Sequence, residues 1–112
     1  MAQVTPIQVI AAGRIVSAAG AWTVTGGWIR GASPTIVDGG VGIATITLDD
    51  PADATVPGTV TIVSPIDAAT GTFGTSTRPS DTTVQFNLWS ATGAAADISF
   101  NFVVLQGPTT TV

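Results

Sequence analysis

Hydrophobic and polar residues alternate with a period of two along much of this chain, and the pattern is clearest in its last third. Residues 82–90 place Val, Phe and Leu at every second position, and residues 98–105 do the same with Ile, Phe, Phe and Val. A period of two is that of a half-buried β-strand. We therefore predict two strands joined into an antiparallel hairpin by the small-residue turn at 91–97. Its inward side chains are predicted to be Val84, Phe86, Leu88, Ile98, Phe100, Phe102 and Val104.

The polar side of this predicted hairpin becomes apolar near its ends, at Trp89, Val103 and Leu105. A strand that is apolar on both faces needs a second partner besides the core of its own domain. We therefore expect these three side chains to lie at an interface between subunits.

Shorter alternating segments precede the hairpin, and Gly, Pro and Asp residues separate them as turn signals. Residues 41–48 are predicted to form a strand in which Ala44, Ile46 and Leu48 point inward. Residues 71–77 are predicted to form a weak strand at a sheet edge. Helical periodicity is absent throughout the sequence, so the pattern indicates an all-β protein, an antiparallel β-sandwich of jelly-roll type. The other predicted strands are 7–17, with Gly13 as a possible bulge, 21–25, 27–30 and 59–64, with turns at 38–40 and 78–81.

The length and the turn pattern divide the chain into three parts. Residues 1–6 are expected to be an extended N-terminal arm, 7–105 a single jelly-roll domain, and 106–112 a polar, Thr-rich tail. A chain of 112 residues is the size of one domain and can bury roughly two-thirds of its unfolded surface. It therefore needs neither a disulfide nor a metal ion in order to fold.

Charge is scarce, which points to burial in an assembly. Charged residues make up 9% of the chain, against about 25% in an ordinary domain, and 45% of its residues are hydrophobic. The net charge of −4 opposes binding to nucleic acid, which needs clustered Lys and Arg. No apolar run is long enough to span a membrane, and residues 1–6 lack the basic start of a secretory signal. We expect synthesis in a cytoplasm.

Few residues could carry out catalysis. The sequence has no Cys, His, Lys, Glu or Tyr, so only Asp could act as a general acid or base. The seven aspartates are more simply explained as loop and turn residues. We therefore expect that the protein is not an enzyme and binds no cofactor. The alternative is a small glycoside hydrolase that uses two aspartates. Asp49, Asp50 and Asp53 form a carboxylate cluster that could bind calcium, without the spacing of an EF-hand. Three residues could be sugar platforms, core pillars or interface anchors: Trp22, Trp28 and Trp89.

Four segments of the chain resemble a known family when they are taken together in order. They are Gly-Ile-Ala-Thr-Ile-Thr-Leu at 42–48, Thr-Val-Thr-Ile-Val-Ser-Pro at 59–65, Thr-Val-Gln-Phe-Asn at 83–87, and the stretch with Asp97, Phe100, Phe102 and Val104 at 93–105. This order is similar to that in the small jelly-roll heads of tailed-bacteriophage structural proteins, which resemble trimeric tumour-necrosis-factor-type jelly rolls. The resemblance covers about residues 41–105, and residues 1–40 contain no collagen-like or coiled-coil pattern.

The resemblance implies a virion structural protein. We expect a homotrimeric capsid decoration (cement) protein on the capsid exterior that binds the major capsid protein noncovalently. Trp89, Val103 and Leu105 are then expected at the trimer interface. The N-terminal arm, with Val4, Pro6 and Ile7, is expected to dock on the coat. The alternative implied by the same family is the receptor- or glycan-binding head of a phage fibre.

Overall fold

The computed structural model describes residues 3–5, 7–18, 21–24, 28–49, 59–66, 71–107 and 109–111, and it describes the side chains of all these except 3–5 and 109–111. Within this part of the chain every regular element is a strand. The strands are β1 (Gln3–Thr5), β2 (Gln8–Ala18), β3 (Ala21–Thr23), β4 (Ile29–Arg30), β5 (Val37–Gly40), β6 (Ile43–Thr47), β7 (Thr59–Pro65), β8 (Phe73–Ser80), β9 (Thr83–Trp89), β10 (Phe100–Gln106) and β11 (Thr109–Thr111).

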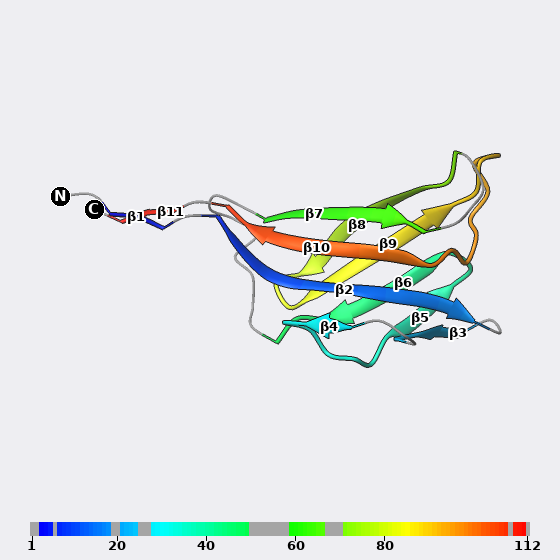
Figure 1. The fold of residues 1–112 in the computed structure, drawn as a ribbon, viewed down its shortest axis with the longest axis horizontal. Helices are drawn as coiled ribbons and strands as arrows, with labels where there is room; N and C mark the ends of the chain where they lie inside the picture. Colours follow the sequence, from blue (N-terminus) through cyan, green and yellow to red (C-terminus); the bar gives the residue numbers. More distant parts are fainter. Residues whose placement is uncertain are drawn as a thin grey trace.

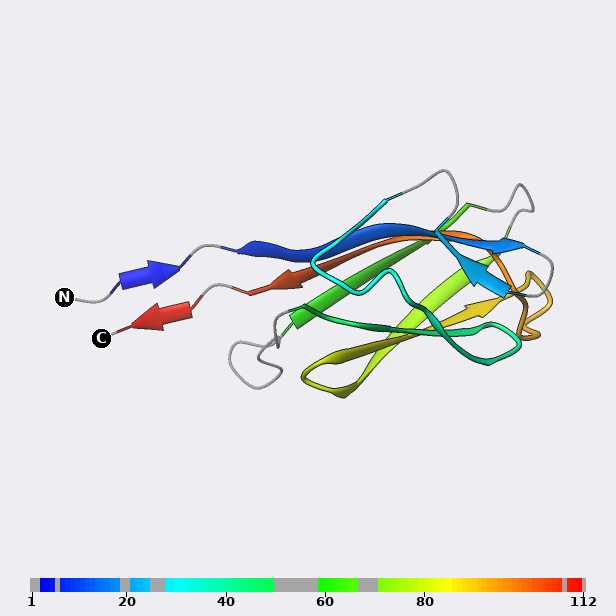
Figure 2. The same cartoon turned by 90° about the horizontal axis from the view of Figure 1, so that it is seen from below.

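Two antiparallel sheets pack face to face (Figures 1 and 2). The first sheet has the order β3-β2-β10-β7, with β4 paired to β2, and the second has the order β5-β6-β9-β8. Along the chain β2, β7 and β10 belong to the first sheet, while β6, β8 and β9 belong to the second. These six strands follow the wrapped connectivity of a jelly roll, and β3, β4 and β5 extend the two sheets. The predicted all-β antiparallel sandwich is confirmed.

The predicted hairpin of residues 82–105 is wrong, because its two strands belong to different sheets. β9 pairs with β6 and β8, whereas β10 pairs with β2 and β7. The segment between them therefore crosses from one sheet to the other. Period-two alternation is the same in both arrangements, since it reports which side of a strand is buried and not which strand lies beside it.

The core fills the space between the two sheets, and aromatic rings from β9 and β10 meet at its centre. The ring centroid of Phe86 lies 4.8 Å from that of Phe100 and 5.0 Å from that of Phe102. Trp22 packs edge-on against Phe100 at 5.9 Å. All seven side chains predicted to point inward from 82–105 are buried. The buried core comprises Ala11, Ile15, Trp22, Ala32, Ala44, Ile46, Leu48, Val84, Phe86, Leu88, Ile98, Phe100, Phe102 and Val104.

The bulge in β2 lies elsewhere than the sequence suggested. Gly13 pairs regularly with Phe102. The bulge is at Ile10 instead, because Val104 pairs with Ala11 and the next residue of β10, Leu105, pairs with Val9. Gly13 is needed for close approach: a Cβ there would lie 2.7 Å from both the carbonyl oxygen of Trp28 and the side chain of Ile29. The glycine therefore allows β4 to pack tightly against β2.

β8 runs further than predicted, to Ser80, and the turn to β9 follows at 81–82. Arg78 holds this turn together. Its Nε donates to the carbonyl oxygen of Thr83 at 3.0 Å, and one terminal nitrogen donates to that of Asp81 at 2.9 Å. The other terminal nitrogen donates to Thr59 Oγ1 at 2.6 Å, which links the turn to β7 in the other sheet. As predicted, β8 lies at a sheet edge.

The two ends of the chain form a separate two-stranded ribbon. β1 pairs antiparallel with β11, with Val4 opposite Thr110. The ribbon extends from one end of the sandwich (Figures 1 and 2), and the molecule measures 53 × 26 × 23 Å. The segments expected to be an independent arm and tail are thus paired with each other.

Candidate functional site

The outer face of the first sheet is a candidate interaction surface, and its composition follows from the strand register. Val103 on β10 lies between Ala12 on β2 and Ile62 on β7. Leu105, two residues along β10, lies between Val9 and Val60. Because their neighbours Phe102 and Val104 are buried, these side chains point away from the core. The result is a continuous surface, called here the apolar face: Val9, Ala12, Val60, Ile62, Val103 and Leu105.

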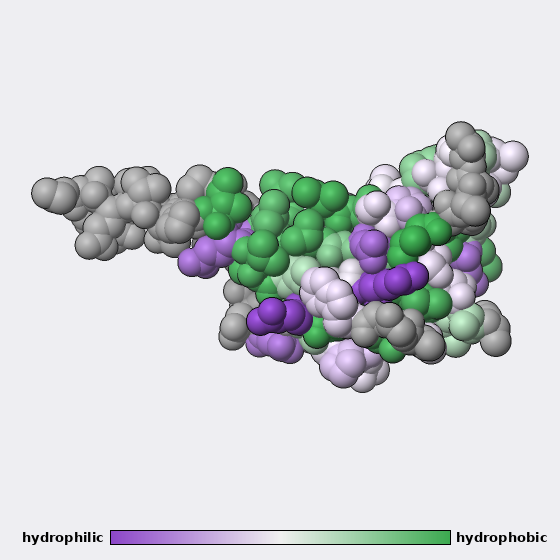
Figure 3. Space-filling model, viewed as in Figure 1, coloured by the Kyte–Doolittle hydropathy of each residue, from purple (hydrophilic) through white to green (hydrophobic). Residues whose placement is uncertain are grey.

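The apolar face is open to solvent in a single chain. Val9 is 63% exposed, Val60 58% and Ile62 51%. Ile7, next to this face along β2, is 62% exposed. Figure 3 shows the hydrophobic surface over β2, β10 and β7, on the half of the sandwich nearest the terminal ribbon. Isolated exposed apolar residues are ordinary, but a contiguous apolar surface usually marks a site of interaction.

The apolar face ends at a polar row, one step further along the same strands. Asn101 on β10 lies between Arg14 on β2 and Ser64 on β7. The aspartates with described side chains lie elsewhere, on β5 or in connections between strands: Asp38, Asp49, Asp81 and Asp97. In the described part of the chain this sheet face therefore carries positive charge at its margin and no carboxylate.

The outer face of the second sheet is different in character. Gln85 on β9 lies between Thr45 and Thr77, and Asn87 lies between Ile43 and Thr75. The amide of Gln85 donates to Asn87 Oδ1 at 3.3 Å, so the polar side chains also contact each other. The same face also carries apolar side chains, since Val37 pairs with Thr45 and is 58% exposed, and Phe73 pairs with Trp89 and is 46% exposed. The outer face of the second sheet is therefore mixed, whereas that of the first sheet is continuously apolar around Val103 and Leu105, and the apolar face is the candidate site.

The three residues predicted at a subunit interface are divided between the two sheets. Val103 and Leu105 lie together at the centre of the apolar face. Trp89 is on β9 in the second sheet, where its ring stacks on Phe73 with the centroids 6.1 Å apart and 17° between the planes. Sequence reasoning grouped them because it took β9 and β10 to be paired.

The residues predicted to form a docking arm are described only in part. Val4 lies in β1, in the terminal ribbon. Ile7 precedes β2 and is exposed, beside the apolar face. Pro6 lies outside the described residues.

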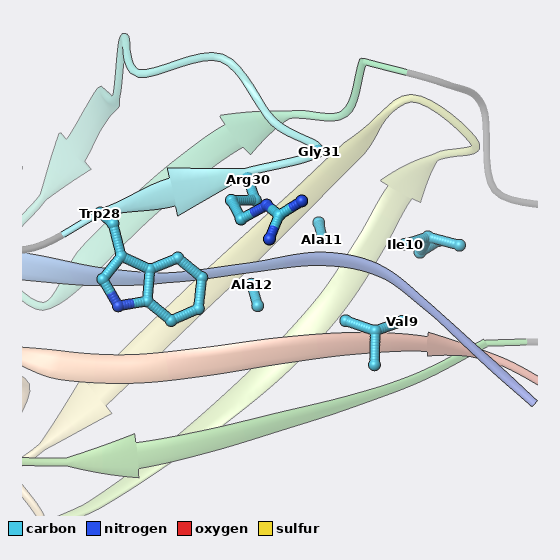
Figure 4. A pocket seen from close by; sticks show the side chains of 7 residues that line it. All are labelled: Val9, Ile10, Ala11, Ala12, Trp28, Arg30 and Gly31. Carbon is cyan, nitrogen blue, oxygen red and sulfur yellow. The ribbon is translucent and has the colours of Figure 1, made fainter.

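A groove lies where the apolar face meets the short strand β4 (Figure 4). Its volume is about 420 Å³. Ile29 packs against the core, so its neighbours Trp28 and Arg30 point outward on either side of it. Arg30 pairs with Ala12 in register, and Trp28 is 56% exposed. The residues that line the groove are Val9, Ile10, Ala11, Ala12, Trp28, Arg30 and Gly31.

The other candidate sites contribute less. Trp22 is a core residue and Trp89 is stacked on Phe73, so Trp28 is the tryptophan left as an exposed platform. Asp50 and Asp53 of the possible calcium cluster lie outside the described residues, and Asp49 is exposed. The described side chains include no group of three or more potential metal ligands. Nor does the described part of the chain contain a helix long and apolar enough to cross a membrane.

Sequence reasoning missed Ala12 and Ile62 as partners of Val103, and Val9 and Val60 as partners of Leu105. A signal for two of them existed, since Val60 and Ile62 alternate with Thr59 and Thr61, but the alternation alone assigns them to the core. Only the pairing of β7 with β10 shows that they face outward.

No protein-family model, curated protein or solved structure matches this chain.

Proposed function

We propose that this protein is a virion structural protein, a noncovalent capsid decoration protein that acts as a homotrimer on the outside of a bacteriophage coat. The observation that carries the proposal is the apolar face around Val103 and Leu105, which is continuous over three strands, whereas the outer face of the opposite sheet is mixed. A domain with one continuous apolar face is suited to be covered on that side. The sequence resemblance of residues 41–105 supplies the phage and capsid part of the proposal.

Burial between subunits accounts for the apolar face energetically. Complete burial of a Val or Ile side chain contributes roughly 1.5–3 kcal/mol, and Val9, Val60 and Ile62 each leave half or more of their surface exposed. Covering these three alone would contribute on the order of 3 kcal/mol per subunit. A second copy is the occupant we favour, because Val103 and Leu105 fall at the centre of the face and no carboxylate from the described residues lies on it.

The terminal ribbon is the proposed contact with the coat. An isolated two-stranded ribbon is marginally stable in water, and its outer edges leave backbone groups free to pair with another strand. β1 and β11 extend beyond the sandwich, so these edges are accessible to a neighbouring protein (Figure 1). A strand of the major capsid protein could therefore add to the ribbon by main-chain hydrogen bonds.

The test is co-sedimentation of the purified protein with coat lattices that lack it. The full chain is expected to sediment with the lattice at a fixed stoichiometry. Removal of residues 109–112 takes away β11 and should abolish co-sedimentation while the sandwich stays folded. Release of bound protein by moderate heating in denaturing detergent would agree with noncovalent attachment. Failure of the full chain to bind at micromolar concentration contradicts the capsid proposal.

A receptor-binding fibre head is the second candidate, and the exposed indole of Trp28 favours it. The two roles differ in where the protein lies and in how many copies are present. Labelled antibody and electron microscopy of intact particles would show density over the whole capsid for a decoration protein. Label confined to the tail or to a few fibres would support the receptor-binding role instead.

A further inference from the structure

We propose that the groove between β2 and β4 binds a carboxylated sugar, with Trp28 stacked on the pyranose ring and Arg30 paired with its carboxylate. The groove shares Val9 and Ala12 with the apolar face, so the proposal requires that a second copy on that face leaves Trp28 and Arg30 open. The carboxylate could belong to a free uronic acid or to a uronic acid unit within an acidic polysaccharide. Both present a pyranose ring and a single negative charge.

The groove owes its shape to β4 and to the bulge in β2. β4 pairs with β2 only at Ala12 and Gly13, and β2 bulges at Ile10 just beyond that pairing. Gly31, at φ +74°, turns the chain at this point; a Cβ there would lie within 2.9 Å of the carbonyl carbon of Ile10. The strands are thus fixed against each other by close backbone packing, and the hollow between them is built into the fold.

Trp28 provides a flat apolar platform at one side of the groove. Its carbonyl oxygen accepts a hydrogen bond of 2.9 Å from the backbone N–H of Arg14, which fixes its main chain. Figure 4 shows the indole lying over β2, near Ala12. The C–H bonds of a pyranose ring are apolar on one face, so they can pack on such a ring as an aliphatic group does.

Arg30 gives the groove its charge preference. Its side chain is exposed on the same sheet face as Ala12, and it has no hydrogen bond or ion pair in the described part of the chain. None of the residues that line the groove is acidic. A guanidinium presents two parallel N–H donors that match a carboxylate, which favours an anionic ligand over a neutral one.

The dimensions and the lining also limit the ligand. A volume of about 420 Å³ lies in the usual range of small-molecule sites, roughly 300–1,000 Å³. Val9 and Ala12 provide an apolar floor, and Arg30 is the one cation among the lining residues. A single charge beside one aromatic ring suits one carboxylated sugar unit better than a nucleic acid strand, whose binding needs a row of cations.

The experiment is a titration of the full chain with glucuronate, with glucose as the neutral counterpart, followed by tryptophan fluorescence and by two-dimensional NMR. Glucuronate should shift the amide signals of residues 28–31 and change the emission of the exposed Trp28. Glucose should bind at least about tenfold more weakly. Polygalacturonate should bind more tightly than galacturonate, its own monomer, if the site accepts a unit within a chain.

Single substitutions locate the site. Arg30→Gln should weaken glucuronate binding at least about tenfold and remove the preference over glucose. Trp28→Ala should weaken it by a similar factor, and Trp28→Phe should keep part of the affinity. Arg14→Gln is the matched control, because Arg14 lies on the same sheet face outside the groove, and it should change the affinity less than about twofold.

Three results would overturn the proposal. One is equal affinity for glucose and glucuronate, and another is unchanged binding by the Arg30→Gln protein. The third is tighter binding of benzoate than of glucuronate, which would assign the groove to aromatic acids. The oligomeric state of the same samples should also be measured. This measurement distinguishes a failure of the proposed sugar site from a failure of the proposed subunit interface.

Discussion

At the scale of single residues, Asp97 and Gly42 show how a loop is fixed to the sandwich. Asp97 Oδ1 accepts a hydrogen bond of 2.7 Å from the backbone N–H of Gly42, in the turn between β5 and β6. Gly42 has φ +72°, and its carbonyl oxygen accepts from the N–H of Leu88 at 2.7 Å. The sequence resemblance included Asp97, and the structure gives this residue a structural role. Sequence alone could not choose it from seven aspartates, since its partner lies 55 residues away.

Substitution of Gly42 tests this arrangement. In Gly42→Ala the new Cβ would lie 2.6 Å from the carbonyl oxygen of Leu88, on a backbone that L-residues rarely adopt. We expect a loss of at least about 3 kcal/mol in the free energy of unfolding, measured in urea. Gly93→Ala is the control, because its φ is +84° but no atom lies within 4 Å, and it should cost only about 1 kcal/mol. Equal losses for the two would show that close packing at Gly42 is unimportant.

At the scale of elements, alternation predicted the buried sides of β6, β9 and β10 correctly but not their neighbours. It assigned β9 and β10 to one hairpin, whereas they face each other across the core. β7 shows a second limit. Its Thr61 lies opposite the buried Val104 while Ile62 faces outward, the reverse of what polarity alone suggests. Which strand pairs with which is set by contacts between distant segments, and a local pattern does not contain them.

Phe86 tests the packing between the two sheets. It is fully buried and contacts two rings of β10, so Phe86→Ala should lower the free energy of unfolding by about 3–5 kcal/mol. Phe73→Ala removes the same group from the stacked pair on the outer face, where Phe73 is 46% exposed, and should cost about 1 kcal/mol. Urea unfolding of both variants gives the comparison. A smaller loss at Phe86 than at Phe73 would contradict the arrangement of the core.

Arg78 tests the link between β7 and the turn from β8 to β9. Its guanidinium donates to the carbonyl oxygens of Ser80, Asp81 and Thr83 and to Thr59 Oγ1, a geometry that an ammonium group cannot reproduce. Arg78→Lys should therefore cost about 1–3 kcal/mol in urea unfolding although the charge is kept. Arg14→Lys, at an exposed position, is the control and should be nearly neutral. A loss for Arg78→Lys no greater than that of the control would mean that the link adds little.

At the scale of the whole molecule, the first sheet has a continuous apolar outer face and the second sheet a mixed one. Sequence reasoning placed Val103 and Leu105 outward, and it inferred from the low charge that some surface is covered. It could not assemble the apolar face, because Val9 and Val60 reach Leu105 only through the register of three strands. Nor could it find the terminal ribbon, since Val4 and Thr110 lie at opposite ends of the chain.

The central claim is that second copies of the chain cover the apolar face, and the molar mass in solution tests it most directly. Light scattering after size-exclusion chromatography should give three times the chain mass of 11.2 kDa for the natural protein. Val103→Asp should give a folded monomer, because it places a carboxylate at the centre of the face. Gln85→Asp, which places the same charge on the outer face of the second sheet, should remain trimeric. A natural protein that is monomeric at high concentration, or a Val103→Asp trimer as stable as the original, would contradict the account.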